Sequence, residues 1–267
     1  MVLNHTSLGE SGPEVAFCHG LFGQGKNWTG IGKAVADDHR VLLIDLPDHG
    51  QSPRSERFDY LAYADQVAEL IDAEGGSHDP VALVGHSMGG KVAMLVALRR
   101  PDLVERLVVV DVAPVAYDHA VEFDGYIAAM QAIDLETLER RSDADEALRE
   151  AVPDPMVRGF LLQSLRREGG ASGGWRWLLN LELLGRDLDL ITDWPEERLA
   201  GVAAYEGPVL WLGGQRSPYV RPDYATAMDR WFPRNRRVTV KDAGHWVHSE
   251  QPEVFVEVLR RFLEQHV

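Results

Sequence analysis

The chain has few cysteines, few basic side chains relative to acidic ones, and only short apolar runs. Cys18 is the only cysteine among 267 residues, so no disulfide can form within the chain. This usage fits a reducing compartment. The 27 basic side chains stand against 42 acidic ones, which gives a formal net charge of −15. Because nucleic acids and anionic membrane surfaces are bound by clustered Lys and Arg, we expect neither as a partner.

The longest apolar runs, such as residues 92–98, are far too short to span a bilayer. The first residues also lack the basic region and apolar stretch of a secretory signal. We therefore expect a cytoplasmic protein without membrane insertion. Nothing in the sequence indicates an oligomeric state.

Short apolar segments alternate with helical patterns along much of the chain. Continuous apolar runs are typical of strands buried on both faces, and strands are expected at residues 15–18, 41–44, 81–84, 107–110, 208–212 and 237–240. Helical patterns lie at residues 60–74, 91–100, 222–231 and 252–265. This alternation predicts an α/β fold with a mostly parallel central sheet flanked by helices. In such sheets the chemistry lies at the carboxyl ends of the strands.

Residues 112–205 interrupt this alternation, because they contain no convincing buried strand. Helical patterns occur there at residues 123–133, 135–141, 145–152 and 155–167. We predict a core formed by residues 1–111 and 206–267, with residues 112–205 inserted as a helical cap over the carboxyl edge of the sheet. The predicted cap carries 9 basic and 18 acidic side chains. This charge favours neutral substrates over polyanions.

The segment GHSMG at residues 85–89 is the strongest chemical signal. A G-x-S-x-G sequence between a buried strand and an apolar helix is typical of a nucleophile elbow. The tight turn requires small residues and exposes Ser87 at a helix N-terminus, where the helix dipole favours developing negative charge. The alternative is a glycine-rich turn with an incidental serine, which this context disfavours.

Four segments together resemble the α/β-hydrolase superfamily. They are the GHSMG elbow, HGLFG at residues 19–23, DLPDHGQS at 45–52 and GHWVHSEQP at 244–252. These segments resemble the elbow, the oxyanion loop, the D-x-x-G-x-G-x-S turn (with His49 where Gly is commoner) and the histidine motif. Through Lys91, VDVAP at 110–114 and SPY at 217–219, the closer resemblance is to small bacterial YbfF-type esterases. The resemblance implies the α/β-hydrolase fold and covers the chain outside residues 112–205.

Ser87 needs a general base, since a free hydroxyl is a poor nucleophile at neutral pH. Of the 10 histidines, His245 fits best because it follows the last predicted strand in a loop of small residues. The chain order of nucleophile, acid and histidine also agrees. His248 is a competitor, and a metal pair formed with His245 is conceivable on spacing, but no nearby cysteine or further histidine supports it. No metal or other cofactor is expected.

The acid of the triad has three candidates. The resemblance places the acid of most superfamily members after the strand at 208–212, where Ser217 stands here, and it places the acid of the resembling esterases at Asp111. A buried carboxylate at Asp111 could accept the proton of the His245 Nδ1 and fix its tautomer. Asp111 could instead only cap the end of its strand. Asp223 and Asp242 are the alternative acids.

The oxyanion hole is expected to use the backbone N–H groups of Leu21 and Met88, with Phe22 as the alternative to Leu21. The substrate pocket is predicted to include aromatic side chains: Phe22, Trp175, Trp177, Tyr219 and Trp246. Mostly apolar walls are typical of ligand sites. Packing of the cap on the core explains the Trp- and Leu-rich stretch at 175–184 equally simply.

These residues predict a serine hydrolase that cleaves small to medium neutral carboxylic esters through an acyl-Ser87 intermediate, with His245 as base and Asp111 orienting it. The alternatives on the same triad are hydrolysis of thioesters, lactones or carbon–carbon bonds, and a cofactor-free haloperoxidase side reaction. The alternative from another class is a non-catalytic receptor that binds a ligand in the hydrolase pocket. The expected partner is in each case a small molecule.

Overall fold

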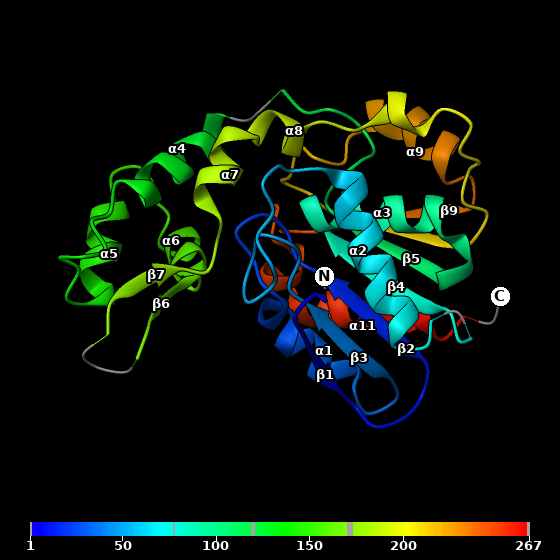
Figure 1. Cartoon of the computed structure of the whole chain (residues 1–267). Coiled ribbons are helices and arrows are strands. Elements are labelled where there is room, and N and C mark those ends of the chain that lie inside the picture. The colour runs from blue at the N-terminus through cyan, green and yellow to red at the C-terminus, as the bar shows by residue number, and fades with distance from the viewer. Residues whose placement is uncertain (1, 77, 119–120, 170–172, 266–267) are drawn as a thin grey trace.

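The computed structural model describes residues 2–76, 78–118, 121–169 and 173–265. Within them, seven strands form one sheet in the order β1-β3-β2-β4-β5-β8-β9 (Figure 1). Only β1 is antiparallel to its neighbour, and the other pairs are parallel. The strands are β1 (His5–Leu8), β2 (Glu14–Cys18), β3 (Arg40–Ile44), β4 (Val81–His86), β5 (Val104–Val110), β8 (Val209–Gly214) and β9 (Asn235–Val240). The predicted mostly parallel α/β fold is confirmed.

The six predicted strands are all present, and β1 is the strand that the apolar runs did not indicate. Its sequence HTSL is largely polar, and none of its residues is fully buried. As an edge strand, β1 is covered by a neighbour on one side only. Such a strand carries no continuous apolar run.

Helices cover both faces of the sheet. The helices α2 (Tyr60–Ala73) and α3 (Met88–Arg99) pack together on one face, and α1 (Thr29–Val35) and α11 (Pro252–Leu263) on the other. Successive residues of a strand point to opposite faces. In β2, Ala16 and Cys18 belong to the first apolar core, while Val15 and Phe17 belong to the second. The remaining helices outside the insert are η1 (Gly25–Trp28), η2 (Pro101–Leu103), η5 (Pro222–Tyr224), α9 (Ala225–Trp231) and α10 (Val247–Glu250).

Between β5 and β8 the chain forms helices and one short ribbon, which lie largely to one side of the sheet in Figure 1. The helices are α4 (Val121–Gln131), α5 (Arg141–Leu148), α6 (Pro155–Leu162), α7 (Leu181–Arg186), α8 (Leu188–Thr192) and η4 (Glu196–Leu199). The ribbon pairs β6 (Leu165–Arg167) with β7 (Trp175–Trp177) in antiparallel register. The boundaries proposed for a separate cap at 112–205 stay a prediction.

One predicted helix in this insert is wrong, and another is predicted five residues too long. Residues 135–141 do not form a helix, because the Asp134 carboxylate accepts hydrogen bonds from Glu136 N (3.0 Å) and Thr137 Oγ1 (2.9 Å) and so favours a turn. The pattern over 155–167 ends at Leu162. Ser164 there bonds back to Leu161 O through its backbone N–H (3.1 Å) and its hydroxyl (2.7 Å), and β6 follows.

The short apolar runs and the single cysteine noted in the sequence can also be compared with the structure. None of the helices in the described part of the chain is both long and apolar enough to cross a bilayer. Cys18 is buried at the end of β2, and burial raises the pKa of its thiol to about 12. The thiol is therefore protonated and unreactive at neutral pH.

Candidate active site

Ser87 occupies a sharp turn between β4 and α3. Its backbone has φ +53° and ψ −123°, a conformation that costs a non-glycine residue about 1–3 kcal/mol and occurs mainly at functional sites. The flanking glycines permit the turn. A Cβ atom on Gly85 would lie 2.3 Å from the Gly89 carbonyl oxygen, and one on Gly89 would lie 2.3 Å from the His19 carbonyl oxygen. The small residues of the GHSMG segment are thus required by close backbone approach.

The loop at residues 19–23 lies directly beside this turn. A Cβ atom placed on Gly20 would come within 3.1 Å of the Ser87 Cβ. In the described loops and turns, the N–H groups of Leu21 and Met88 donate no hydrogen bond to another backbone oxygen. Both residues line the cavity that Ser87 borders.

His19 supports this loop from the inside. Its Nε2 accepts a hydrogen bond from Leu46 N (3.0 Å), and its Nδ1 lies 2.8 Å from the Gly20 carbonyl oxygen. Burial lowers the pKa of the His19 imidazole to about 3. The ring is therefore neutral, with one nitrogen accepting and the other donating, which is a structural role.

The structure brings Asp111 and His245, the predicted acid and base, into contact. Asp111 directly follows β5, is fully buried and has φ +53°. Its Oδ2 lies 2.7 Å from His245 Nδ1 and also accepts a hydrogen bond from the Ser217 hydroxyl. Its Oδ1 accepts a bond from Gly214 N (2.9 Å). Three donors hold this carboxylate, and Nδ1–H donation leaves the Nε2 lone pair of His245 available as a base.

The His245 ring lies in the loop between β9 and α10, and its neighbours restrict it. His86 donates from Nε2 to the His245 carbonyl oxygen (2.9 Å), and burial lowers the pKa of His86 well below its ordinary value. The Tyr219 ring lies 4.4 Å from the His245 ring, centroid to centroid, and the Trp246 ring 5.5 Å. A neutral histidine and two aromatic rings thus hold the base in place.

The alternative acids, Asp223 and Asp242, and the alternative base, His248, make other contacts. Asp223 is exposed on η5 and pairs with Arg221 (3.4 Å), while Asp242 is exposed and its carbonyl oxygen accepts a bond from Arg216. His248 is buried with its ring stacked on Trp28 at 4.2 Å, and burial lowers the pKa of His248 to about 3. Within the described ranges, no group of three or more His, Cys, Asp or Glu side chains is arranged to hold a metal ion.

Ser87 borders a small cavity with a volume of about 30 Å³. By volume this is room for one or two water molecules rather than for a long acyl chain. Tyr219, Leu21 and Met88 are the sequence-predicted residues, besides Ser87, that line it. The complete lining is Leu21, Tyr60, Ser87, Met88, Lys91, Val112, Tyr117, Phe123, Ile191, Thr192 and Tyr219.

The other four aromatic residues predicted for the pocket are not in this lining. Phe22 is buried, with its ring edge-on to Phe123 at 6.1 Å. Trp175 and Trp177 belong to the ribbon strand β7, where the Arg167 guanidinium lies 5.3 Å from the Trp175 ring centroid. Trp246 borders a separate hollow together with Phe160. The structure therefore brings only Tyr219 of this group to the cavity beside Ser87.

Lys91 is a buried cation in the cavity wall, one helical turn after Ser87. Its Nζ donates to the carbonyl oxygens of Thr192 (2.7 Å) and Asp193 (2.6 Å) at the end of α8. The ammonium also lies 4.9 Å from the Tyr117 ring centroid. Burial lowers the pKa of Lys91 to about 7. Lys91 thus links the helix of the nucleophile to the insert.

The sequence reasoning assigned no role to Ser217, Lys91 or Tyr117. The sequence does contain a signal for Ser217, because this residue stands where the resemblance places the acid of most superfamily members. Tyr117 accepts a hydrogen bond from Ala113 N (2.6 Å) and donates to the Tyr219 carbonyl oxygen (2.7 Å). Because these partners are backbone groups, no side-chain pattern could reveal them.

A family model described as the alpha/beta hydrolase fold matches residues 13–252. The chain belongs to the α/β-hydrolase family. It is 40% identical over 257 residues to a mouse protein named sn-1-specific diacylglycerol lipase ABHD11, covering 94% of this chain and 81% of that protein. It is 32% identical to esterase YbfF of Escherichia coli, covering 93% of this chain and 92% of YbfF. The resemblance to YbfF is thus confirmed.

Among solved structures, the chain is similar to one titled marine microorganism esterase. The TM-score is 0.91 at 31% sequence identity, and the match covers 98% of this chain and 99% of that one. This similarity extends over the sheet and the insert alike. It confirms the α/β-hydrolase fold.

Proposed function

We propose that this protein is a serine hydrolase that cleaves carboxylic esters through an acyl-Ser87 intermediate. The observation that carries the proposal is the buried Asp111 carboxylate, 2.7 Å from His245 Nδ1, in a chain whose Ser87 occupies the strained elbow. The relatives support the same class, since they are named esterases and lipases.

In this mechanism the Ser87 hydroxyl attacks the carbonyl carbon of the ester, and His245 Nε2 takes its proton. Asp111 keeps the Nδ1 proton in place and stabilises the imidazolium that forms. His245 then returns the proton to the leaving alcohol. Water, deprotonated by His245, attacks the acyl-Ser87 ester and releases the acid. Three fixed hydrogen bonds to Asp111 make this orientation available before substrate binds.

The N–H groups of Leu21 and Met88 form the proposed oxyanion hole. Each such donor typically lowers the barrier by about 3 kcal/mol, because it is oriented before charge develops on the carbonyl oxygen. Met88 is the first residue of α3, so the positive end of the helix dipole also stabilises negative charge at this point. Phe22 stays the alternative to Leu21.

The cavity points to small neutral acyl groups. Apolar side chains such as Val112, Phe123 and Ile191 form much of its wall, and the volume is about 30 Å³. Each methylene group buried in such a wall contributes about 0.8 kcal/mol. The 18 acidic side chains of residues 112–205 oppose the approach of polyanionic substrates at low salt.

The test is the hydrolysis of p-nitrophenyl esters by wild-type protein and by Ser87→Ala. We expect the variant to lose roughly 10⁴-fold or more in kcat while keeping its circular dichroism spectrum and thermal unfolding midpoint. Esterase activity retained in the folded variant would exclude Ser87 as the nucleophile. A matched series of neutral esters, thioesters and lactones ranks the substrate classes that the same triad could serve.

A further inference from the structure

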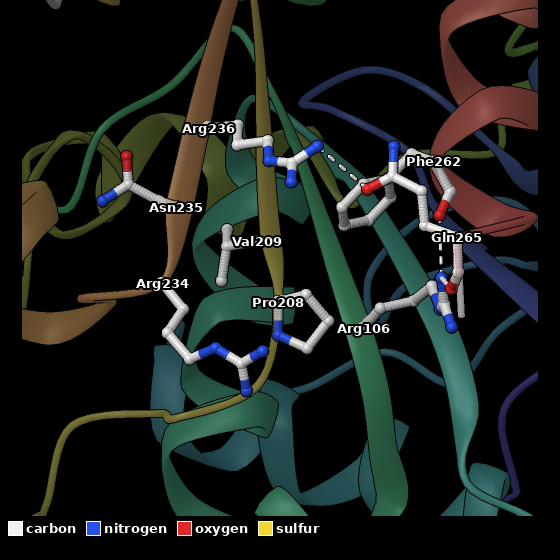
Figure 2. A pocket seen from close by; sticks show the side chains of 8 residues that line it. All are labelled: Arg106, Pro208, Val209, Arg234, Asn235, Arg236, Phe262 and Gln265. Atoms are coloured by element: carbon white, nitrogen blue, oxygen red, sulfur yellow. Dashed lines mark hydrogen bonds between the residues drawn. The ribbon is translucent and has the colours of Figure 1, made fainter. Parts of the chain in front are cut away.

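A second hollow lies at the opposite edge of the sheet from Ser87. Its volume is about 270 Å³. The residues that line it lie where β8 and β9 begin, near the start of β5 and at the end of α11 (Figure 2). These strands are parallel, so their first residues share one edge and Asp111, which follows β5, lies at the other. The lining is Arg106, Pro208, Val209, Arg234, Asn235, Arg236, Phe262 and Gln265.

Among the residues that the structure describes, three arginines and no carboxylate side chain line this hollow. Arg106 is buried and three contacts hold its guanidinium: it donates to the carbonyl oxygens of Phe262 (2.7 Å) and Gln265 (3.0 Å) and pairs with Glu105 (2.7 Å) outside the lining. Arg106 therefore stabilises the end of α11 and forms a positively charged wall.

Arg234 and Arg236 are differently placed. Arg236 donates to the side-chain oxygen of Gln265 (3.0 Å), and Arg234 donates to the backbone oxygen of Glu206 (3.1 Å). Both acceptors are neutral. Among the residues that the structure describes, no carboxylate oxygen lies within 4.0 Å of either guanidinium. Each guanidinium has five N–H donors, so most of them are available to a ligand.

The next residue along β9 makes the contrast clear. Arg237 does not line the hollow and forms a close ion pair with Asp229. In a chain with a net charge of −15, carboxylates are abundant, yet none of those in the described part of the chain lines the face that carries Arg234 and Arg236. Residues 234–237 form a basic run, and as a sequence this run is typical of the solvent-exposed start of a strand. In the structure Arg237 pairs with a carboxylate, whereas Arg234 and Arg236 line the hollow without a carboxylate partner among the described residues.

We propose that this hollow binds the phosphate group of a small organic phosphate. Guanidinium groups match the geometry of phosphate oxygens and bind them through charge-assisted hydrogen bonds. A phosphate monoester carries a charge of about −1.5 to −2 at neutral pH and supplies three acceptor oxygens, which suits the free donors of a guanidinium such as that of Arg236. Among the apolar residues of the lining, Pro208 is half-buried and offers apolar contact to the organic part of the ligand, while Val209 and Phe262 are buried and form the floor of the hollow. The site stands independently of the proposed hydrolysis.

The experiment is isothermal titration of the full chain with phenyl phosphate and, separately, with inorganic phosphate, at constant ionic strength. Arg236→Gln is expected to weaken phenyl phosphate binding about tenfold or more, since one charge-assisted contact is lost. Arg234→Gln/Arg236→Gln is expected to abolish detectable binding. Arg237→Gln removes the same charge from the same strand and is the matched control, with a dissociation constant within about twofold of wild type. Phenyl phosphate is expected to bind more tightly than inorganic phosphate.

Three results would overturn the proposal: no binding of either phosphate to wild-type protein, equal binding to wild type and Arg236→Gln, or equal weakening by Arg236→Gln and Arg237→Gln. Equal affinity for the two phosphates would overturn the organic part of the assignment. Thermal unfolding of each variant without ligand verifies that it is folded, and Arg106 is left intact because it supports α11. Ester hydrolysis by the same variants separates a failure here from a failure of the proposed mechanism.

Discussion

The two sides of the cavity beside Ser87 are built in different ways. On the sheet side, Ser87 and Asp111 each follow a buried strand in a left-handed backbone turn, and Asp111 is held by three hydrogen bonds. On the side of the insert, Phe123 and Ile191 contribute apolar side chains, and the hydrogen bonds at the end of α8 reach backbone carbonyl groups, from Tyr60 to Ile191 (2.6 Å) and from Lys91 to Thr192 (2.7 Å). If the proposed function is correct, the sheet determines which reaction is possible, while the insert determines which acyl group fits.

The largest effect is expected on the sheet side, from Asp111→Asn. The amide cannot stabilise the imidazolium and favours the wrong tautomer of His245, so kcat should fall by about 10⁴-fold. Steady-state hydrolysis of p-nitrophenyl acetate measures this loss. Asp223→Asn is the control and should leave kcat unchanged, because Asp223 is exposed and paired with Arg221. A collapse caused only by Asp223→Asn would move the acid of the triad to that residue.

Ser217→Ala tests whether the hydrogen bonds to Asp111 matter individually. The substitution removes one donor to Asp111 Oδ2 and leaves Gly214 N and His245 in place. Hydrogen bonds to charged groups contribute about 1.5–3 kcal/mol, so kcat/KM should fall about tenfold or more. Ser142→Ala, on the exposed surface of α5, should have no effect. If both variants match wild type, Gly214 and His245 alone suffice to hold the carboxylate.

Phe123→Ala tests the side of the insert. Removing the ring enlarges a cavity of about 30 Å³, so longer acyl chains should gain room. The ratio of kcat/KM for octanoate to that for acetate esters should rise about fourfold or more, the value of one additional buried methylene. Phe160→Ala, which opens the separate hollow at Trp246, should leave the ratio unchanged. An unchanged ratio in Phe123→Ala would show that the insert does not limit chain length.

Lys91 connects the two sides, and its charge should make their joint stability depend on pH. The pKa of Lys91 is lowered to about 7 in the folded protein, so between pH 7 and its ordinary value the unfolded chain binds more protons than the folded one. The contribution of Lys91 to the free energy of unfolding therefore rises with pH in this window, by at most about 1.4 kcal/mol per pH unit. Below pH 7 its burial costs stability in full.

Urea denaturation of wild type and Lys91→Met from pH 7 to pH 10 measures this effect. The stability of Lys91→Met relative to wild type should be highest near pH 7 and should fall as the pH rises. Lys33→Met, at an exposed position on α1, is the matched control for the loss of one lysine. Parallel pH curves for wild type and Lys91→Met would show that Lys91 keeps an ordinary pKa in the folded protein.

The same contrast explains how much of the molecule was predictable from the sequence. Strands buried on both faces require continuous apolar runs, so β2, β3, β4, β5 and β8 were found, while the polar edge strand β1 was not. The other edge strand, β9, was also found, but only one of its six residues is fully buried, so the expectation of burial on both faces is wrong for β9. Ser87, Asp111 and His245 were found because each follows a strand at the carboxyl edge of the sheet. Their roles stay predictions, but the contact between Asp111 and His245 agrees with them.

The part of the cavity wall that the insert contributes could not be predicted from the sequence. Phe123 and Ile191 reach the cavity through the packing of α4 and α8, which leaves no spacing signal in the sequence. Trp177 is an aromatic residue of the kind that lines ligand pockets, but its side chain is buried in the ribbon strand β7. Lys91 bonds to two backbone carbonyl groups, and any residue at 192 and 193 could supply these.

The central claim is that Ser87 is the nucleophile. The most direct measurement is reaction of the purified protein with a fluorophosphonate, followed by intact mass and peptide mapping, with esterase activity recorded in parallel. We predict one adduct per chain, located on Ser87, which forms at the same rate as activity is lost and is absent from Ser87→Ala. Esterase activity that persists with Ser87 fully modified, or an adduct on another residue that accounts for the loss, would contradict the account.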